Sequence, residues 1–196
     1  DSKKLLFKKE LDAAPAIEII KRGNELGTTV LAWCENRLYV NTFNDISEAY
    51  KNKTNSKAEL IDNPESLAAK GITKLIWNDT HERIKDFLGN LKVNPIKDAA
   101  AFASETVYLE FVNGEVSKGS ALKKIAEYYN ISQKDILAIG NGFNDVSMIE
   151  YAGLGVAVGN APEDVRRAAN FIAVSNDEGG VAEVVEEFVI KADRKD

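Results

Sequence analysis

Short apolar runs alternate with helix-like stretches in the second half of the chain. Residues 136–139, 154–158 and 171–174 are apolar at nearly every position, and the runs are too short for helices. Such runs are typical of strands that are buried on both faces of a parallel sheet. The stretches around them carry the periodicity and capping residues of helices: 118–129, 144–152, 162–169 and 180–190. This half therefore predicts an α/β fold in which helices cover a parallel sheet on two sides.

The first half of the chain is less regular, and its apolar runs are rich in β-branched and aromatic residues. We expect extended segments at 5–7, 28–34, 37–40, 72–77 and 106–112. We expect helices at 15–26, 46–51 and 79–88. The change of pattern between the two halves predicts two α/β domains, 1–103 and 104–196.

Composition and charge narrow the classes of function. The chain has 196 residues, of which 44% are hydrophobic and 29% charged, and its formal net charge is −6. A negative charge argues against a nucleic-acid or anionic-membrane partner, because both normally require a basic patch. No apolar run approaches the roughly 18 residues of a membrane-spanning helix. We therefore expect a soluble protein with a small-molecule partner.

Cysteine, histidine and methionine are scarce. The chain has one cysteine, which excludes an internal disulfide framework and makes a reducing, cytoplasmic location the expected one. With one cysteine and one histidine, a zinc site is also disfavoured. Any bound metal is expected to be a hard cation such as Mg²⁺ on oxygen ligands. The chain begins at Asp1 and its only methionine is Met148, which predicts that it derives from a longer polypeptide.

Three loops at strand ends or helix starts are candidates for chemistry: 116–119, 140–145 and 158–161. In an open α/β sheet, ligands bind outside the carboxyl ends of the strands. The 140–145 loop has two glycines and leads into a helix, whose N-terminal N–H groups attract anions. Asp145 in this loop either serves a cation or caps the helix. Lys118 opposes the dipole of its own helix, and either binds phosphate or points into solvent.

Four segments of the chain stand out as motifs in a fixed order: Val116-Ser-Lys-Gly-Ser-Ala-Leu, Ala138-Ile-Gly-Asn-Gly-Phe-Asn-Asp-Val-Ser-Met, Gly155-Val-Ala-Val-Gly-Asn-Ala and Asn176-Asp-Glu-Gly-Gly-Val-Ala. Together they resemble the C-terminal half of Cof-type phosphatases of the haloacid dehalogenase superfamily. Their order and spacing match that family over about residues 104–190. The resemblance implies a partial Rossmann-like core in 104–196 and, less specifically, an α/β cap domain in 1–103.

The resemblance also implies roles for five residues. Lys118 would neutralise charge on the phosphoryl group and on a nucleophilic carboxylate, and Asn144 would lie near the phosphate. Asn141 and Asp145 would hold Mg²⁺, directly or through water. Asn160 would shape the floor of the pocket. The implied activity is hydrolysis of a small phosphorylated metabolite, often a sugar phosphate in this family.

Two departures from the family pattern weaken this assignment of activity. Residue 141 is Asn where the family has Asp, which removes one charge from the metal site. The family's Asp-x-Asp segment, which carries the nucleophile, has no counterpart in these residues. The chain alone is therefore expected to be inactive, with an exposed sheet edge that self-association or a complementing N-terminal segment would cover. Two alternatives stay open: a non-catalytic module that binds a phosphorylated ligand or a partner, and one half of a split phosphatase.

Overall fold

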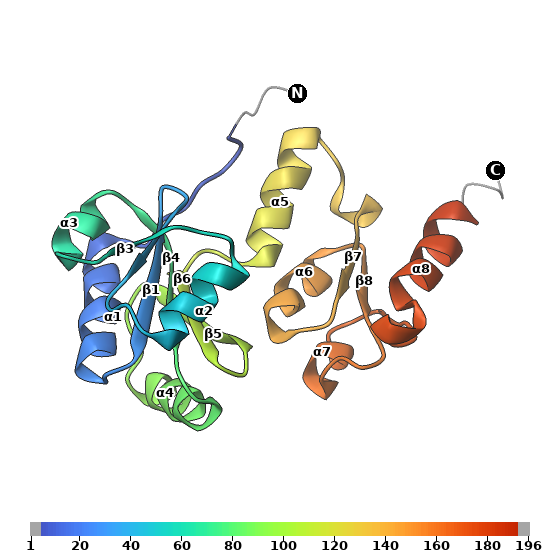
Figure 1. The fold of residues 1–196 in the computed structure, drawn as a ribbon. Coiled ribbons are helices and arrows are strands. Elements are labelled where there is room, and N and C mark those ends of the chain that lie inside the picture. The colour runs from blue at the N-terminus through green and yellow to red at the C-terminus, as the bar shows by residue number, and fades with distance from the viewer. Residues whose placement is uncertain (1–4, 192–196) are drawn as a thin grey trace. The chain divides into compact units, whose positions relative to one another are not determined.

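The structure, a computed structural model, describes residues 5–191 (Figure 1). These residues form two compact units, which we describe separately. The N-terminal unit is Lys8–Val116, and the C-terminal unit contains residues 117–191 together with residues 5–7. Among the residues that the structure describes, no helix is long and apolar enough to cross a membrane.

A six-stranded sheet organises the N-terminal unit, with strand order β3-β2-β1-β4-β6-β5. Its strands are β1 Thr29–Cys34, β2 Arg37–Val40, β3 Ala58–Leu60, β4 Ile72–Asn78, β5 Ala99–Glu105 and β6 Tyr108–Asn113. Neighbouring strands are antiparallel except for β2 and β3, which are parallel. Antiparallel strands can be joined by tight turns, so this sheet needs few crossovers.

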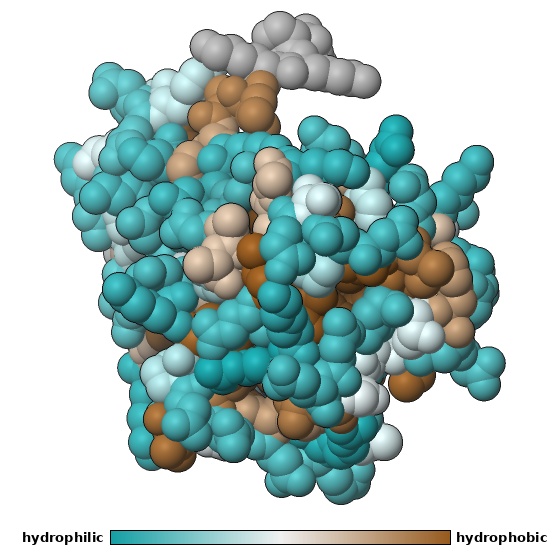
Figure 2. Space-filling model, turned by 90° about the vertical axis from the view of Figure 1, so that its left-hand side faces the viewer, coloured by the Kyte–Doolittle hydropathy of each residue, from teal (hydrophilic) through white to brown (hydrophobic). Residues whose placement is uncertain are grey.

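Four helices pack on this sheet: α1 Ala13–Glu25, α2 Asp45–Lys53, α3 Pro64–Ala69 and α4 His81–Val93. Residues of α1, α3 and α4 share the larger apolar core, on one face of the sheet. Tyr50 of α2 belongs to a smaller core on strand residues of the opposite alternation, such as Leu31 and Ile76. Seen from the left-hand side of Figure 1, apolar surface lies recessed among hydrophilic side chains (Figure 2).

The expected boundary at 103/104 differs from the division in the structure, which falls between Val116 and Ser117. The reason is β6, which lies within the expected second domain of 104–196 but belongs to the sheet of the N-terminal unit. It pairs with β4, with Leu75 opposite Phe111, and with β5 on its other side. Because pairing partners of a strand cannot be read from local pattern, the sequence alone left β6 on the wrong side of the boundary.

A three-stranded parallel sheet with order β7-β8-β9 lies at the centre of the C-terminal unit. Its strands are β7 Leu137–Gly140, β8 Leu154–Ala157 and β9 Phe171–Ile172. Its helices are α5 Lys118–Tyr129, α6 Val146–Tyr151, α7 Glu163–Arg167 and α8 Gly180–Val185. Helices α6 and α7 contribute to one apolar core and α8 to another. The predicted α/β class, with a parallel sheet in the second half, is confirmed.

Local signals explain most of the elements that were predicted, and α3, which was not predicted, also has one, because Asn63 accepts a hydrogen bond from the Ser66 N–H and Pro64 is its first residue. Ser117 caps α5 by accepting a hydrogen bond from the Ser120 N–H at 3.0 Å, and Gly27 follows α1 with a positive φ of 66°. The expected strand at 5–7 is not formed. Among the strands and α-helices of the described residues, β3, α3 and β5 were not predicted. Of these, β5 is an alanine-rich edge strand that only its pairing with β6 defines.

Candidate functional site

The carboxyl ends of β7 and β8 place two of the predicted loops at one edge of the parallel sheet. Gly140, the last residue of β7, pairs with Ala157, the last residue of β8. The 140–145 loop continues from the first strand, and the 158–161 loop continues from the second. Because parallel strands end at the same edge, the two loops share the side of the sheet on which α/β proteins bind ligands.

The start of α5 carries Lys118 to the 140–145 loop. Ser117 and Ser120 exchange hydrogen bonds in a capping box, which fixes where the helix begins. The Gly119 N–H donates to Ser147 Oγ at 3.1 Å, which ties α5 to α6. The Lys118 side chain, 49% exposed, forms an ion pair with the carboxylate of Asp145. Lys118 is thus partly exposed to solvent, but its ammonium group does not simply point into it, because it has a specific partner in Asp145.

Asp145 is the buried acceptor at the centre of the loop. Its side chain is 3% exposed, and Lys118 Nζ donates to Oδ1. Oδ2 accepts hydrogen bonds from the backbone N–H groups of Asn141 and Gly142, both at 2.9 Å. Asp145 thus closes the turn after β7, and it makes no side-chain capping bond to α6.

The surroundings of Asp145 stabilise its charged form. Burial raises the pKa of this carboxyl, but the hydrogen bonds from Lys118, Asn141 and Gly142 outweigh it, and the net pKa lies below its ordinary value. The carboxylate is therefore ionised at neutral pH. An ionised, preorganised carboxylate next to an ammonium group is suited to a cation or to the polar edge of a phosphate pocket.

Glycine permits two close approaches that build the site. A Cβ on Gly119 would lie 2.7 Å from the carbonyl carbon of Ser147, and a Cβ on Gly140 would lie 3.0 Å from Cγ of Asp145. Both distances are shorter than ordinary contacts, so a larger residue would push α5 from α6 or displace the carboxylate. Ser147, whose Oγ accepts from the Gly119 N–H, was not among the predicted site residues, although it follows Asp145 by two residues within a matching segment.

The other predicted residues lie on the same loops with fewer restraints. The side chains of Asn141 and Asn144 are exposed, so they are free to meet a ligand. Asn160 is also exposed, and its Oδ1 accepts a hydrogen bond from the Asn176 N–H at 3.3 Å. The structure thus brings Lys118, Asp145 and the backbone of Asn141 together, and gives Asn160 a separate role in joining the loops after β8 and β9.

Arg166 of α7 contacts the 158–161 loop, although the sequence alone indicated only a solvated helix face at this position. Its Nη1 donates to the Gly159 carbonyl at 3.0 Å, and its Nη2 lies 2.6 Å from Glu163. It restrains the 158–161 loop from α7. No sequence signal distinguished it from an ordinary surface arginine.

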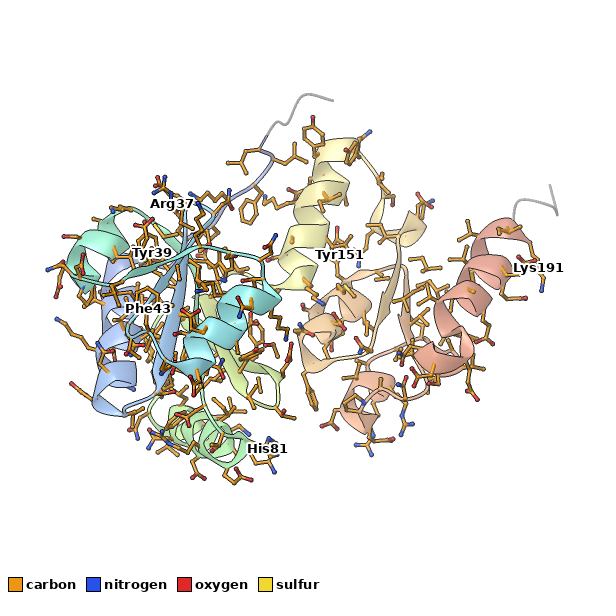
Figure 3. All side chains as sticks on the ribbon, viewed as in Figure 1. Arg37, Tyr39, Phe43, His81, Tyr151 and Lys191 are labelled. Carbon is orange, nitrogen blue, oxygen red and sulfur yellow. The ribbon has the colours of Figure 1, made fainter. Side chains whose placement is uncertain are left out.

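His81 is the first residue of α4 and belongs to the N-terminal unit (Figure 3). Its Nδ1 lies 3.1 Å from the Thr106 carbonyl oxygen.

The donor set fits Mg²⁺ only in part. Within residues 5–191 no three residues among His, Cys, Asp and Glu are grouped as metal ligands. Near the loop the candidate oxygen ligands are the Asp145 carboxylate and the Asn141 amide, and both carboxylate oxygens already accept hydrogen bonds. Since Mg²⁺ prefers six oxygen ligands including one or two carboxylates, these residues provide part of such a site and need further ligands to complete it.

A sequence profile of haloacid dehalogenase-like hydrolases matches residues 1–185 of the chain. This chain belongs to the haloacid dehalogenase-like hydrolase family. The chain is also similar to a crystal structure of a Thermotoga maritima protein, with 29% identity and a TM-score of 0.77 over 95% of this chain and 70% of that one. A haloacid dehalogenase-like hydrolase from Bacteroides thetaiotaomicron shares the fold, at 24% identity and a TM-score of 0.77 over 94% and 70% of the two chains.

Several phosphatases are similar to this chain in sequence. Phosphatase YwpJ of Bacillus subtilis is 39% identical over 93 residues, which are 47% of this chain and 33% of that protein. The 5-amino-6-(5-phospho-D-ribitylamino)uracil phosphatase YitU of the same organism is 33% identical over 105 residues, 54% and 38% of the two chains. The matched stretches thus span only about a third of the length of these relatives. The resemblance to Cof-type hydrolases is confirmed at the level of the family.

Proposed function

We propose that this chain supplies the cap domain and the second half of the catalytic core of a cytoplasmic, Mg²⁺-dependent phosphomonoesterase. Its substrate would be a small phosphorylated metabolite such as a sugar phosphate. The observation that carries the proposal is the pairing of Lys118 with buried Asp145 at the carboxyl end of β7. Membership of the family and the phosphatases among the relatives support it.

Each residue of the site has a role in this proposal. The Lys118 ammonium would share its charge between Asp145 and a phosphoryl group, which lowers the cost of bringing an anion to a carboxylate. The exposed amide of Asn144 would donate to the phosphate, and Asn160 would shape the pocket floor. Asp145 and Asn141 would hold Mg²⁺ directly or through water. Bound Mg²⁺ would neutralise negative charge on the phosphoryl oxygens.

The nucleophilic carboxylate and the remaining metal ligands would come from a complementing N-terminal segment outside these residues. β7 is an edge strand of its sheet within the described part of the chain, so its outer side is open to pairing. Apolar side chains of the same unit are also exposed, among them Ile125 at 47% and Tyr129 at 62%. A further strand beside β7 would cover such surface and bring its own side chains to the carboxyl edge.

An assay with p-nitrophenyl phosphate and Mg²⁺ tests the proposal. We expect the 196-residue chain alone to show no turnover, and turnover to appear when a complementing segment with an Asp-x-Asp motif is added. In that assembly Lys118→Met should lower kcat by about a hundredfold or more. Lys123→Met, a change of the same kind at an exposed position of α5, is the control. Turnover by the chain alone, or equal effects of the two substitutions, would contradict the proposal.

Asn141 favours a second candidate function, a non-catalytic module that binds a phosphorylated ligand. An amide at this position contributes an oxygen ligand without charge, which weakens Mg²⁺ binding, while the backbone N–H groups and Lys118 still attract an anion. Titration with inorganic phosphate should shift the amide resonances of Asn144 and its neighbours under both functions. Phosphate binding combined with no turnover in the complemented assembly would favour the binding module.

A further inference from the structure

Two Asn-Gly pairs occur in the sequence, Asn113-Gly114 and Asn141-Gly142. Asparagine before glycine can lose its side-chain amide without an enzyme, because the next backbone nitrogen can attack the side-chain carbonyl carbon. Glycine favours this reaction, since it has no Cβ to obstruct the approach and its backbone is flexible. The local sequence therefore makes both pairs candidates, and the folded surroundings decide which of them reacts.

Asn113 is held by both ends of its side-chain amide. It is the last residue of β6 and is only 3% exposed. Its Nδ2 donates to the Glu10 carbonyl at 3.0 Å, and its Oδ1 accepts from the Glu115 N–H at 3.0 Å. The Gly114 N–H donates to the Asp98 carbonyl at 2.9 Å. Rotation of the Asn113 side chain onto the Gly114 nitrogen would break two hydrogen bonds of a buried group, so the fold protects this pair.

Asn141 has none of these side-chain restraints. It is exposed, and within residues 5–191 its side-chain amide takes part in no hydrogen bond. The nitrogen that would attack it is already fixed in the loop, because the N–H groups of Asn141 and Gly142 both donate to Oδ2 of Asp145 at 2.9 Å. The amide is thus free to turn, while the nitrogen that it must meet stays in place.

The hydrogen bond from Gly142 to Asp145 does not block the reaction. A peptide N–H lies in the plane of its peptide group, whereas a carbon that reacts with the nitrogen approaches from above or below that plane. The acceptor is also an anion, and a charged acceptor polarises the N–H bond more strongly than the neutral carbonyl that faces Gly114. Water reaches the loop as well, since Asn141 and Asn144 are exposed.

We propose that Asn141 is a modification site, at which the folded chain deamidates without an enzyme while Asn113 stays intact. The Gly142 nitrogen bonds to Cγ of Asn141, and its proton passes through solvent to the side-chain nitrogen, which leaves as ammonia. Water then adds to either carbonyl carbon of the resulting succinimide ring and opens it to aspartate or isoaspartate. One water is consumed, one ammonia is released, and no oxidant or cofactor takes part.

The product carries a carboxylate next to the Lys118–Asp145 pair. The aspartate form keeps the backbone of the loop, so both N–H groups can still donate to Asp145. The isoaspartate form has an extra main-chain carbon, which displaces the Gly142 N–H from Asp145. Under the Mg²⁺ role proposed above, the aspartate form would add a charged ligand to the site, and this consequence alone rests on the proposed function.

Peptide mapping of the intact 196-residue chain tests the proposal. One sample is kept folded in mildly alkaline buffer, a parallel sample is unfolded in guanidinium chloride, and tryptic peptides of both are sequenced at intervals by tandem mass spectrometry. We expect a mass gain of about 1 Da at Asn141 in the folded sample, with Asn113 unchanged over the same time. In the unfolded sample both sites should convert at comparable rates, because glycine follows each asparagine and the contacts of Asn113 are lost.

Variants assign the mass gain to this residue. Asn141→Gln should abolish it over the same time, since the longer side chain would have to close a larger ring, whereas Asn90→Gln, a change of the same kind at an exposed position of α4, should leave it in place. Asn141→Asp marks where the aspartate product elutes in ion exchange. Equal conversion of Asn113 and Asn141 in the folded chain, or protection of both sites by folding, would overturn the proposal. Neither result depends on Mg²⁺ or on phosphatase activity.

Discussion

Replacing Asp145 by alanine tests whether this carboxylate organises the loop after β7. The substitution removes three hydrogen bonds at once, one from Lys118 and two from the backbone N–H groups of Asn141 and Gly142. The side chain is 3% exposed, so water does not reach the position freely in the intact loop. We therefore expect the substitution to destabilise the C-terminal unit.

The magnitude follows from the two kinds of partner. Each backbone N–H that loses a buried, charged acceptor costs about 1–3 kcal/mol, and we take about 1 kcal/mol each because this loop is partly exposed. The Lys118 pair adds about 0–1 kcal/mol because the ammonium group is half exposed. The total is about 2–3 kcal/mol. At ordinary urea m-values this lowers the midpoint of unfolding by about 1 M.

Urea unfolding with two probes localises the effect. Both tryptophans, Trp33 and Trp77, lie in the N-terminal unit, so their fluorescence reports that unit, while far-UV circular dichroism also follows the helices of the C-terminal unit. Asp145→Ala should move the dichroism transition and leave the fluorescence transition in place. The control is Asp164→Ala, at a side chain that is 75% exposed. A shift no larger than that of the control, or an equally large shift for Lys118→Met, would refute the reasoning.

Three further predictions concern the same site and a matched glycine pair. Gly119→Ala should lower the free energy of unfolding by about 1–3 kcal/mol in thermal or urea unfolding, because the new Cβ would overlap the backbone of Ser147. Gly89→Ala should raise it by about 0.5–1 kcal/mol, because this position is helical and no heavy atom lies within 4 Å of the new Cβ. A change of the same sign for both substitutions would contradict this packing. Asn141→Asp should tighten Mg²⁺ binding measured by calorimetry, since it adds a carboxylate, and unchanged affinity would remove this residue from the metal site. The folded-state pKa of Asp145 is lowered because its hydrogen bonds outweigh burial. Its contribution to stability is therefore complete above the unfolded pKa of about 3.9 and is lost as the pH falls from there through the folded-state pKa. Asp145→Asn should flatten this part of the curve of stability against pH, and an unaltered curve would contradict the assignment.

Several elements were determined by local sequence. The helix at 118–129 was predicted with its cap and both ends, because Ser117 can bond the backbone three residues later without help from the rest of the chain. The strands at 137–140 and 154–157 were predicted to within a residue, because their apolar runs are too short for any other buried element. The resemblance of four ordered segments also identified the family, which the profile match confirmed.

The tertiary structure decided the partners of these elements. Lys118 and Asp145 are 27 residues apart, and only the packing of α5 on α6 brings their side chains together. The same holds for β6, whose hydrogen bonds to β4 and β5 place it in the N-terminal unit. Its local sequence pattern is that of a strand and does not indicate which unit the strand belongs to. Capping and periodicity act within a few residues, whereas strand pairing and ion pairs depend on which distant groups the whole fold brings into contact.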